Sequence, residues 1–471
     1  MSRAPLLLLP LSLLLAGCPG ETSPSAPAAP PPAEAPASCS ACHALPPVDA
    51  LPAARFAEVI PTMRDMPTPA GVESVSEADV AGAVAYYLAH APQALPTLAA
   101  APAEARLRFE VARYTPRGVK DGGLPSVSFL AFTPLSDAQK LDLVISDMRA
   151  QALMLLPAWA PAEHRYVRPL AGKVNYPAHV RLRDLDADGR VDLLVAGLGG
   201  MQPVNTRKGS ALVLLQNAQR KFDAHAVLPQ AGRVVDLNAA DLDGDGDLDL
   251  TVCAFGWRGP GQLLVLERGE GLAFTPRVLD ERDGYLDAAP LDLDGDGDLD
   301  LVTLLAQEHE QLVAWINQGA LGFRQQVLHR APHPAWGYSG LALVDMDGDG
   351  DQDALVSNGD ALDDDLLKPY HGVSWLENQS QGATLRFVER RAGALCGCER
   401  AVATDLDGDG DLDVVACSFL PQLGPQAWVE ADLASVVWFE RGGEGDPADW
   451  TWTPRALERH RCVHPTLDAA D

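Results

Sequence analysis

One short acidic motif recurs along most of this chain, and it constrains the fold more than any other feature. Four copies read Asp-x-Asp-Gly-Asp-Gly-Asp-x-Asp, at residues 241–249, 292–300, 345–353 and 405–413. A fifth copy, 184–192, has Ala187 and Arg190 at two of these positions. The last aspartates of successive copies are 51 to 60 residues apart, and Leu141–Ile145 resembles the end of an earlier copy without its acidic loop. A period of this length predicts an array of identical structural units.

The spacing of the carboxylates indicates calcium. Side chains at loop positions 1, 3, 5 and 9, with a backbone carbonyl at position 7, can converge on one hard cation, while glycine at position 6 permits the sharp turn. We therefore expect about five structural calcium ions, coupled to folding because the empty loops crowd like charges. The expected ligands are Asp184, Asp186, Asp188, Asp192, Asp241, Asp243, Asp245, Asp249, Asp292, Asp294, Asp296, Asp300, Asp345, Asp347, Asp349, Asp353, Asp405, Asp407, Asp409 and Asp413.

An EF-hand is the obvious alternative for such a loop, and the sequence excludes it. An EF-hand needs a bidentate glutamate at position 12, where this chain has Val195, Val252, Thr303, Val356 and Ala416. The residues after each loop, such as 250–253 and 414–417, are short β-branched runs that predict strands rather than helices. Further Val-, Leu- and Trp-rich runs follow in each repeat, which suits the blades of a propeller.

The array resembles the FG-GAP/VCBS repeat family, whose blades carry this calcium loop between two strands. The resemblance covers residues 106–471 and implies a mainly β fold, a calcium-binding β-propeller. We expect seven blades with the last one incomplete, because Leu467–Asp471 matches the approach to another loop and then stops. The segment Leu107–Tyr114 is expected to supply an outer strand to that last blade.

A second motif lies near the N-terminus. Cys39, Cys42 and His43 form the C-x-x-C-H pattern, in which two thiols bond to haem and the imidazole binds the iron. A zinc site would need a second pair of ligands, and none follows within fifty residues. We therefore expect one covalent haem c.

Residues 38–95 resemble a small all-α cytochrome c domain placed before the propeller. The resemblance implies a methionine as second axial ligand, and Met63 and Met66 are both suitable; His90 is a weaker candidate. Ser76 to Asp79 predicts the cap of a helix that carries Val80, Val84, Tyr87 and Leu88 at helical spacing.

The first 37 residues predict export and anchoring. Residues 1–17 read as a signal peptide that ends in Leu-Ala-Gly before Cys18, which resembles the lipobox of bacterial lipoproteins. That resemblance implies a lipidated Cys18 on a bacterial membrane, facing the periplasm or the cell surface. Residues 18–37 are rich in proline and alanine and predict an extended tether.

Composition narrows the possible functions. The 471 residues include 36 basic and 65 acidic side chains, for a net charge of −29, which excludes nucleic-acid binding by a basic surface. Gly 41 and Pro 38 argue against a helical bundle. Beyond the lipid and haem cysteines, the pairing of five others stays open: Cys253, Cys396, Cys398, Cys417 and Cys462.

One blade is richer in polar and aromatic residues than the others. His333, Trp336 and Tyr338 precede its loop, and Lys368-Pro-Tyr370-His371 follows it. These side chains suit either a ligand site on a propeller face or a satisfied network between blades.

The sequence as a whole favours an exported electron-transfer lipoprotein whose propeller docks a redox partner. The alternatives are a propeller dehydrogenase that passes substrate electrons to the haem, and a surface adhesion or recognition propeller in which the haem is secondary. No catalytic set is identified, so an electron carrier or binding protein is favoured over an enzyme. The redox partner and the oligomeric state stay open.

Overall fold

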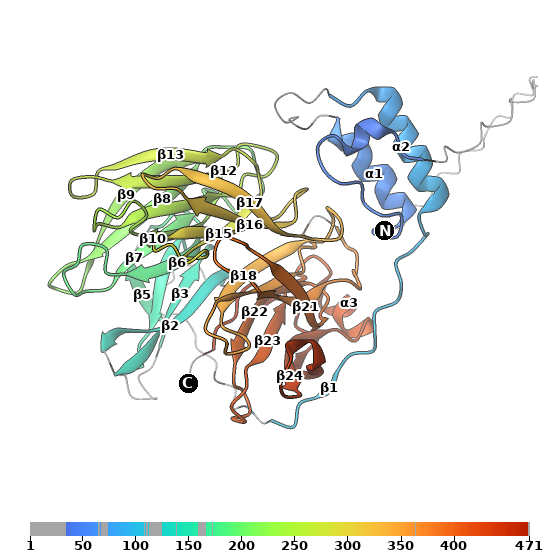
Figure 1. The fold of residues 1–471 in the computed structure, drawn as a ribbon. Coiled ribbons are helices and arrows are strands. Elements are labelled where there is room, and N and C mark those ends of the chain that lie inside the picture. The colour runs from blue at the N-terminus through green and yellow to red at the C-terminus, as the bar shows by residue number, and fades with distance from the viewer. Residues whose placement is uncertain are drawn as a thin grey trace, which may run out of the picture.

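Six β-sheets, five of four strands and one of five, make up most of the described molecule, and they are arranged as the blades of a propeller (Figure 1). The computed structural model describes residues 34–469 except 65, 67–73, 108, 110, 111, 113–124, 138, 159–165, 172 and 363. Each blade uses four strands that are consecutive in sequence and hydrogen-bonded in that order. The blades therefore follow one another along the chain without exchange of strands, apart from one addition to the last.

The first three blades are built from β2 to β13. Their strands are β2 (Val127–Asp137), β3 (Lys140–Asp147), β4 (Ala152–Leu156) and β5 (Arg168–Ala171); β6 (Pro177–Arg183), β7 (Asp192–Gly197), β8 (Gly209–Gln216) and β9 (Phe222–Ala231); β10 (Val234–Ala240), β11 (Asp249–Ala254), β12 (Gln262–Arg268) and β13 (Phe274–Asp280).

The last three blades are built from β14 to β25. Their strands are β14 (Tyr285–Leu291), β15 (Asp300–Leu305), β16 (Gln311–Asn317) and β17 (Phe323–Arg330); β18 (Tyr338–Val344), β19 (Asp353–Asn358), β20 (Gly372–Asn378) and β21 (Phe387–Ala394); β22 (Cys398–Thr404), β23 (Asp413–Ser418), β24 (Ala434–Gly442) and β25 (Thr451–Arg459). A short helix, α3 (Gly424–Glu430), and a 3-10 turn, η3 (Pro447–Asp449), lie within the sixth blade.

Burial explains the sequence pattern within each blade. The second strands, such as β11 and β15, are buried at every position, because neighbouring blades cover both of their faces. They therefore read as continuous apolar runs rather than as alternating ones. The fourth strands lie at the rim, and β13 and β17 have exposed or half-buried side chains at every position. This gradient places the core between the blades.

The first strand of each blade is the innermost one. These strands pack against one another in sequence order, from β2 against β6 through to β18 against β22. The C-terminal segment then reaches the first blade, where the Phe132 backbone N–H on β2 donates to Asp468 Oδ2 at 2.8 Å. The two ends of the ring are therefore connected by residues that follow the last blade.

The N-terminal part forms a small helical unit, defined as residues 37–91. It comprises the 3-10 turn η1 (Ala37–Ser40), α1 (Ala53–Met63) and α2 (Glu77–His90). The expected cap is confirmed, since Ser76 Oγ accepts from the Asp79 N–H at 3.1 Å. Phe56 and Tyr87 stack at 3.9 Å in its core. Leu88 is 49% exposed rather than packed in that core.

Two expectations about the fold are wrong. The propeller has six blades instead of seven, because 467–469 lie at the first blade instead of opening another one. The helical unit is not a separate all-α domain, since its core packs against Ala335 and Leu366 of the propeller. The mainly β assignment is confirmed.

The outer strand that was expected at Leu107–Tyr114 falls mostly outside the described residues. The strand added to the last blade is instead β1 (Ala103–Glu104), which pairs in parallel with β25. Residues 1–33, with the signal segment and Cys18, also lie outside the described residues. Among the described residues, no helix has the length and apolar character needed to cross a membrane.

Candidate functional site

The five acidic loops connect the first and second strands of blades two to six, as expected. In the third blade, Asp241 at position 1 organises the turn, because its carboxylate accepts the N–H groups of Gly244 at 2.8 Å and Gly246 at 3.0 Å. Both glycines have positive φ, at 77° and 95°, which only glycine adopts without strain. Strands follow every loop.

The position-9 aspartates are buried anchors. In blade three, Asp249 is 1% exposed and accepts two backbone N–H groups, from Leu242 within the loop at 3.2 Å and from Arg268 on β12 at 2.8 Å. The same pair of bonds recurs in the other four loops, at Asp192, Asp300, Asp353 and Asp413. These carboxylates therefore tie each loop to the third strand of its blade.

The remaining carboxylates leave oxygen atoms for a cation. Oxygens of Asp241, Asp243 and Asp245 lie within 4.8 Å of one another, and the corresponding group in blade five is Asp345, Asp347 and Asp349. In blade two, Asp184 and Asp186 lie within that range of Asp192, and in blade four Asp292 and Asp294 of Asp300. The donor set of clustered carboxylates fits a hard divalent ion.

Position 7 adds a ligand candidate that the sequence reasoning missed. The Oδ1 atoms of Asp247, Asp351 and Asp411 are buried without a hydrogen-bond partner. A buried carboxylate oxygen without a partner is costly, and a bound cation removes that cost. We had assigned only the backbone carbonyl at this position; the aspartate repeated there in four copies was the available signal.

The loops carry electrostatic strain in the absence of an ion. Burial, followed by the neighbouring carboxylates Asp349 and Asp347, raises the pKa of Asp351 to about 6. Burial also raises the pKa of Asp353 to about 7. A bound cation would relieve this repulsion in the loop of blade five.

The loop of blade two carries a cation of its own. Arg190 occupies position 7, and its guanidinium forms an ion pair with Asp188 at position 5. Its Nε atom also donates to the Gln216 carbonyl at 2.6 Å. This loop is therefore partly neutralised by a residue of its own sequence, whereas in blade six the position-7 aspartate, Asp411, pairs at 3.1 Å with Arg441 on β24.

The C-x-x-C-H segment has the free groups that haem attachment requires. Cys39 and Cys42 are not paired in a disulfide. The His43 Nδ1 atom lies 2.8 Å from the Ala44 carbonyl oxygen, so Nδ1–H donates and Nε2 keeps its lone pair. These residues fit a covalent haem. Met63 ends α1 and Met66 follows it, and neither belongs to the core of the helical unit among the described residues.

The C-x-x-C-H segment faces the propeller. His43 lies close enough to Glu308 and His309, on the loop between β15 and β16, to influence their pKa values, and burial lowers the pKa of His309 to about 4. Nearby, the Tyr370 hydroxyl donates at 3.3 Å to the Ala50 carbonyl of the helical unit. The helical unit therefore lies over blades four and five.

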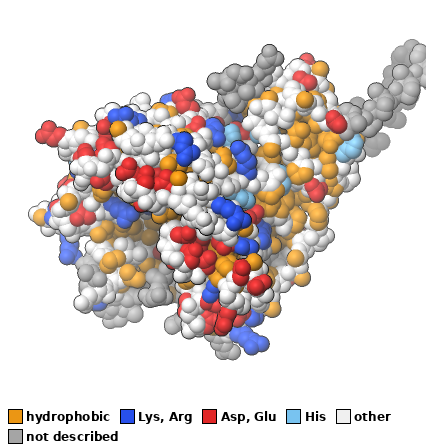
Figure 2. All heavy atoms as spheres, viewed as in Figure 1, with side chains coloured by type: hydrophobic (Ala, Val, Ile, Leu, Met, Phe, Trp, Pro, Cys, Tyr) orange, Lys and Arg blue, Asp and Glu red, His pale blue; other side chains and the backbone are white. Residues whose placement is uncertain are grey.

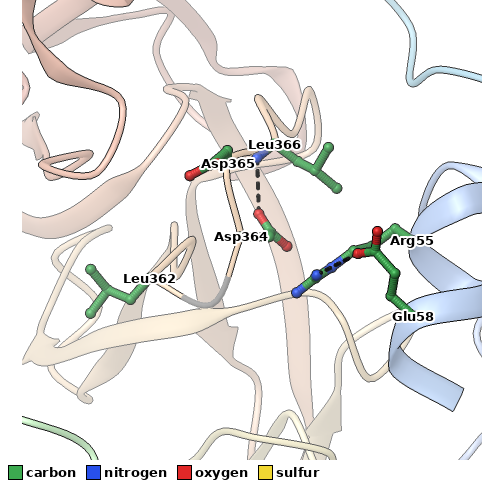
Figure 3. A pocket seen from close by; sticks show the side chains of 6 residues that line it. All are labelled: Arg55, Glu58, Leu362, Asp364, Asp365 and Leu366. Atoms are coloured by element: carbon green, nitrogen blue, oxygen red, sulfur yellow. Dashed lines mark hydrogen bonds and ion pairs between the residues drawn. The ribbon is translucent and has the colours of Figure 1, made fainter. Parts of the chain in front are cut away.

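The polar and aromatic residues of blade five form part of this interface. Tyr370 stacks on Trp336 at 5.4 Å and meets the His333 ring edge-on at 4.8 Å, while His371 is fully buried. Beside them, a polar pocket of about 350 Å³ lies between α1 and residues 362–366 (Figure 3). Its lining includes Arg55, Glu58 and Asp364. These residues therefore form a contact surface for the helical unit.

The other cysteines are unpaired: Cys253, Cys396, Cys398, Cys417 and Cys462. Cys253 and Cys417 occupy equivalent positions of β11 and β23, and both side chains are fully buried.

A charged cluster on the central axis was also missed. His179 and Arg181 on β6 contact Asp236 on β10, and Arg181 reaches Asp287 on β14 at 2.8 Å. A signal existed, since His179, Asp236 and Asp287 each lie five residues before the first aspartate of a loop.

Comparison with known families agrees with these loops. The family described as FG-GAP-like repeat matches residues 184–252 and 292–356, which contain the loops of blades two to five. The protein therefore carries FG-GAP-like repeats in a β-propeller fold.

Two further comparisons add little. No curated protein matches the chain. One similar solved structure is that of a proposed 6-phosphogluconolactonase from Bacteroides uniformis ATCC 8492, with 14% sequence identity and a TM-score of 0.41. That match covers 72% of this chain and 88% of the other, and we draw nothing about activity from it.

Proposed function

We propose that this protein is an exported, lipid-anchored electron carrier in which the N-terminal helical unit holds one covalent haem c and a calcium-stabilised propeller provides the docking surface. The observation that carries the proposal is the pair of unpaired thiols at Cys39 and Cys42 beside His43, whose Nε2 atom is left available. Bound haem supplies reversible one-electron chemistry.

The chain's own residues prepare the attachment segment. The His43–Ala44 hydrogen bond fixes the imidazole tautomer, and the Tyr87 hydroxyl donates to the Pro46 carbonyl at 2.7 Å, which holds the segment against α2. Burial raises the pKa of the Cys39 thiol, which keeps it protonated before attachment. Either Met63 or Met66 would complete the iron coordination.

The propeller's proposed contribution is a rigid acidic surface. Acidic side chains gather on the propeller face in Figure 2, whereas the helical unit presents many hydrophobic side chains there. We propose calcium at the four near-identical loops, with weaker binding at the blade-two loop because Arg190 already neutralises it. A charged surface of this kind favours a basic redox partner.

The decisive experiment is to produce the full-length chain with cytochrome c maturation and to record oxidised and reduced spectra and a pyridine haemochrome. One c-type haem per chain is expected, lost in Cys39→Ala/Cys42→Ala and kept in the matched control Cys253→Ala. Separate Met63→Ala and Met66→Ala variants identify the second ligand through loss of the charge-transfer band of methionine-ligated ferric haem.

A second candidate function is calcium-dependent recognition by the propeller alone, which the FG-GAP-like repeats favour. Absence of haem, under conditions in which a control cytochrome matures, would overturn electron transfer and leave this function. The lipid anchor is tested separately by labelling with a radioactive fatty acid, which Cys18→Ala should abolish.

A further inference from the structure

Six structurally equivalent residues surround the axis of the propeller. Each innermost strand has an irregularity near its start. In blades three to six the residue just after it pairs with the fifth residue of the second strand, and in blade one with the counterpart of that residue. In blade two, His179 lies within the irregularity. We call this set the axial ring: Phe129, His179, Asp236, Asp287, Gly340 and Arg400.

Contacts between blades show that these positions face one another. The Phe129 and His179 rings meet edge-on at 4.5 Å, and His179 Nδ1 bonds Asp236. Arg181, two residues after His179, reaches past β10 to Asp287 on β14, at 2.8 Å. Only side chains that converge on a narrow axis can connect blades two and four in this way.

Arg400 is the exception in the ring, because its charge is not paired. Within the described residues its guanidinium has no hydrogen-bond or ion-pair partner. It lies across Gly340, where an added Cβ would sit 3.0 Å from an Arg400 guanidinium nitrogen. The absence of a side chain at Gly340 is therefore what gives Arg400 its place in the ring.

The nearby carboxyl groups do not neutralise Arg400. Asp287 is engaged by Arg181. Glu399 is adjacent in sequence, and burial raises its pKa to about 8, which leaves it largely protonated at neutral pH. A guanidinium stays charged at all relevant pH values and has a planar donor edge that suits two oxygen atoms.

We propose that the axial ring binds a small oxyanion, of the carboxylate or sulfate and phosphate type, on the guanidinium of Arg400. This site is separate from the haem segment and from the calcium loops, so its test does not depend on the function proposed above.

A metal ion is the alternative occupant, and the geometry disfavours it. Ligand atoms of His179, Asp236 and Asp287 lie within 4.8 Å of one another. However, Arg181 already donates to both carboxylates, at 3.3 Å and 2.8 Å, so a cation would have to displace a positive group. The unpaired charge on this axis is positive, which favours an anion.

Isothermal titration calorimetry on the calcium-loaded full-length chain tests the proposal, with sodium succinate and sodium sulfate as separate probes in a low-chloride buffer. Binding of either probe with a millimolar or lower Kd is expected, and the stronger probe identifies the anion type. Arg400→Gln should weaken it by about tenfold or more, and Arg400→Lys by less. Arg258→Gln is the matched control, since Arg258 is exposed and lies over Trp257 instead of on the axis.

Selenate soaked into crystals of the unmodified protein gives a readout that does not depend on how a variant folds. An anomalous peak at the Arg400 guanidinium, together with binding in solution, supports the proposal. The proposal is overturned if neither probe binds in solution, if Arg400→Gln and Arg258→Gln bind equally well, or if selenate occupies only other positions.

Discussion

In the first blade, the Asp142 carboxylate accepts a hydrogen bond from the Ala158 backbone N–H at 2.9 Å. Asp142 aligns with the position-9 aspartates of the other blades, although no acidic loop precedes it. Its Oδ1 atom performs the same task as that of Asp249, which accepts the N–H of Arg268 at the end of the third strand of its own blade. The anchoring role of this aspartate therefore does not depend on a calcium site.

We accordingly expect Asp142→Ala to lower the free energy of unfolding by about 1–3 kcal/mol, because the half-buried Ala158 N–H loses a charged acceptor. The loss should be equal with calcium and with EGTA. Asp249→Ala should cost more with calcium than with EGTA, since it also affects a loop. Urea unfolding under both conditions measures this, with exposed Glu281→Ala as control. A calcium-dependent effect of Asp142→Ala would contradict the assignment.

The ion pair of Arg190 with Asp188 leads to a prediction about the number of calcium ions bound per chain. Replacement by aspartate removes the ion pair with Asp188 and restores the position-7 aspartate that the other loops have. Arg190→Asp should therefore bind one more tight calcium ion per chain than the unmodified protein in equilibrium dialysis. Lys221→Asp, an exposed change in the same blade, should leave the stoichiometry unchanged. Equal stoichiometry in all three proteins would show that Arg190 does not weaken its loop.

The positive φ at position 4 of the acidic loops leads to a prediction about backbone strain. Ala187 has φ of 58°, where the other loops have glycine, and a Cβ at Gly244 would meet nothing within 4 Å. Ala187→Gly should therefore raise the free energy of unfolding by roughly 0.5–1 kcal/mol, and Gly244→Ala should lower it by about 1–2 kcal/mol. Urea unfolding in EGTA separates this effect from metal binding. A lower free energy of unfolding for Ala187→Gly, together with a higher one for Gly244→Ala, would refute the strain argument.

The raised pKa of Asp287 leads to a prediction about how the free energy of unfolding depends on pH. Burial, followed by the charge on Asp236, raises its pKa from 3.8 to about 7. Between these values the folded state binds more protons than the unfolded state, so the free energy of unfolding falls as pH rises, by at most about 1.4 kcal/mol per pH unit. Above pH 7 this contribution is constant.

Asp287→Asn should therefore flatten the dependence of Tm on pH between pH 4.5 and 7.5 in saturating calcium. The exposed change Glu430→Gln serves as control. A difference in Tm between Asp287→Asn and the unmodified protein that does not vary with pH would show that Asp287 titrates normally.

The sequence was a good guide where the structure is local. Nine-residue loops with fixed glycines, followed by buried apolar strands, were predicted because both features depend on adjacent residues. The Ser76 cap of α2 was predicted for the same reason. The hydrogen bonds that anchor Asp249 were not predicted, because one of the donors, Arg268, lies in another strand.

The blade count and the axial ring depend on distant contacts, which sequence patterns do not determine. Residues 467–469 match the approach to a loop, but Asp468 instead accepts the Phe132 N–H, 336 residues away in sequence. In the same way, His179 and Asp287 become neighbours of Arg181 only after the strands are in register. The packing of the helical unit on the propeller also depends on a distant contact, the hydrogen bond between Tyr370 and Ala50.

The contact between Tyr370 and Ala50 has a consequence for the order of events during synthesis. The two residues are 320 positions apart, so at about 5–20 residues per second Tyr370 is made roughly 15–60 seconds after Ala50. For that interval the helical unit lacks the propeller contact at Ala50. The helical unit therefore cannot reach its final packing until the fifth blade has folded.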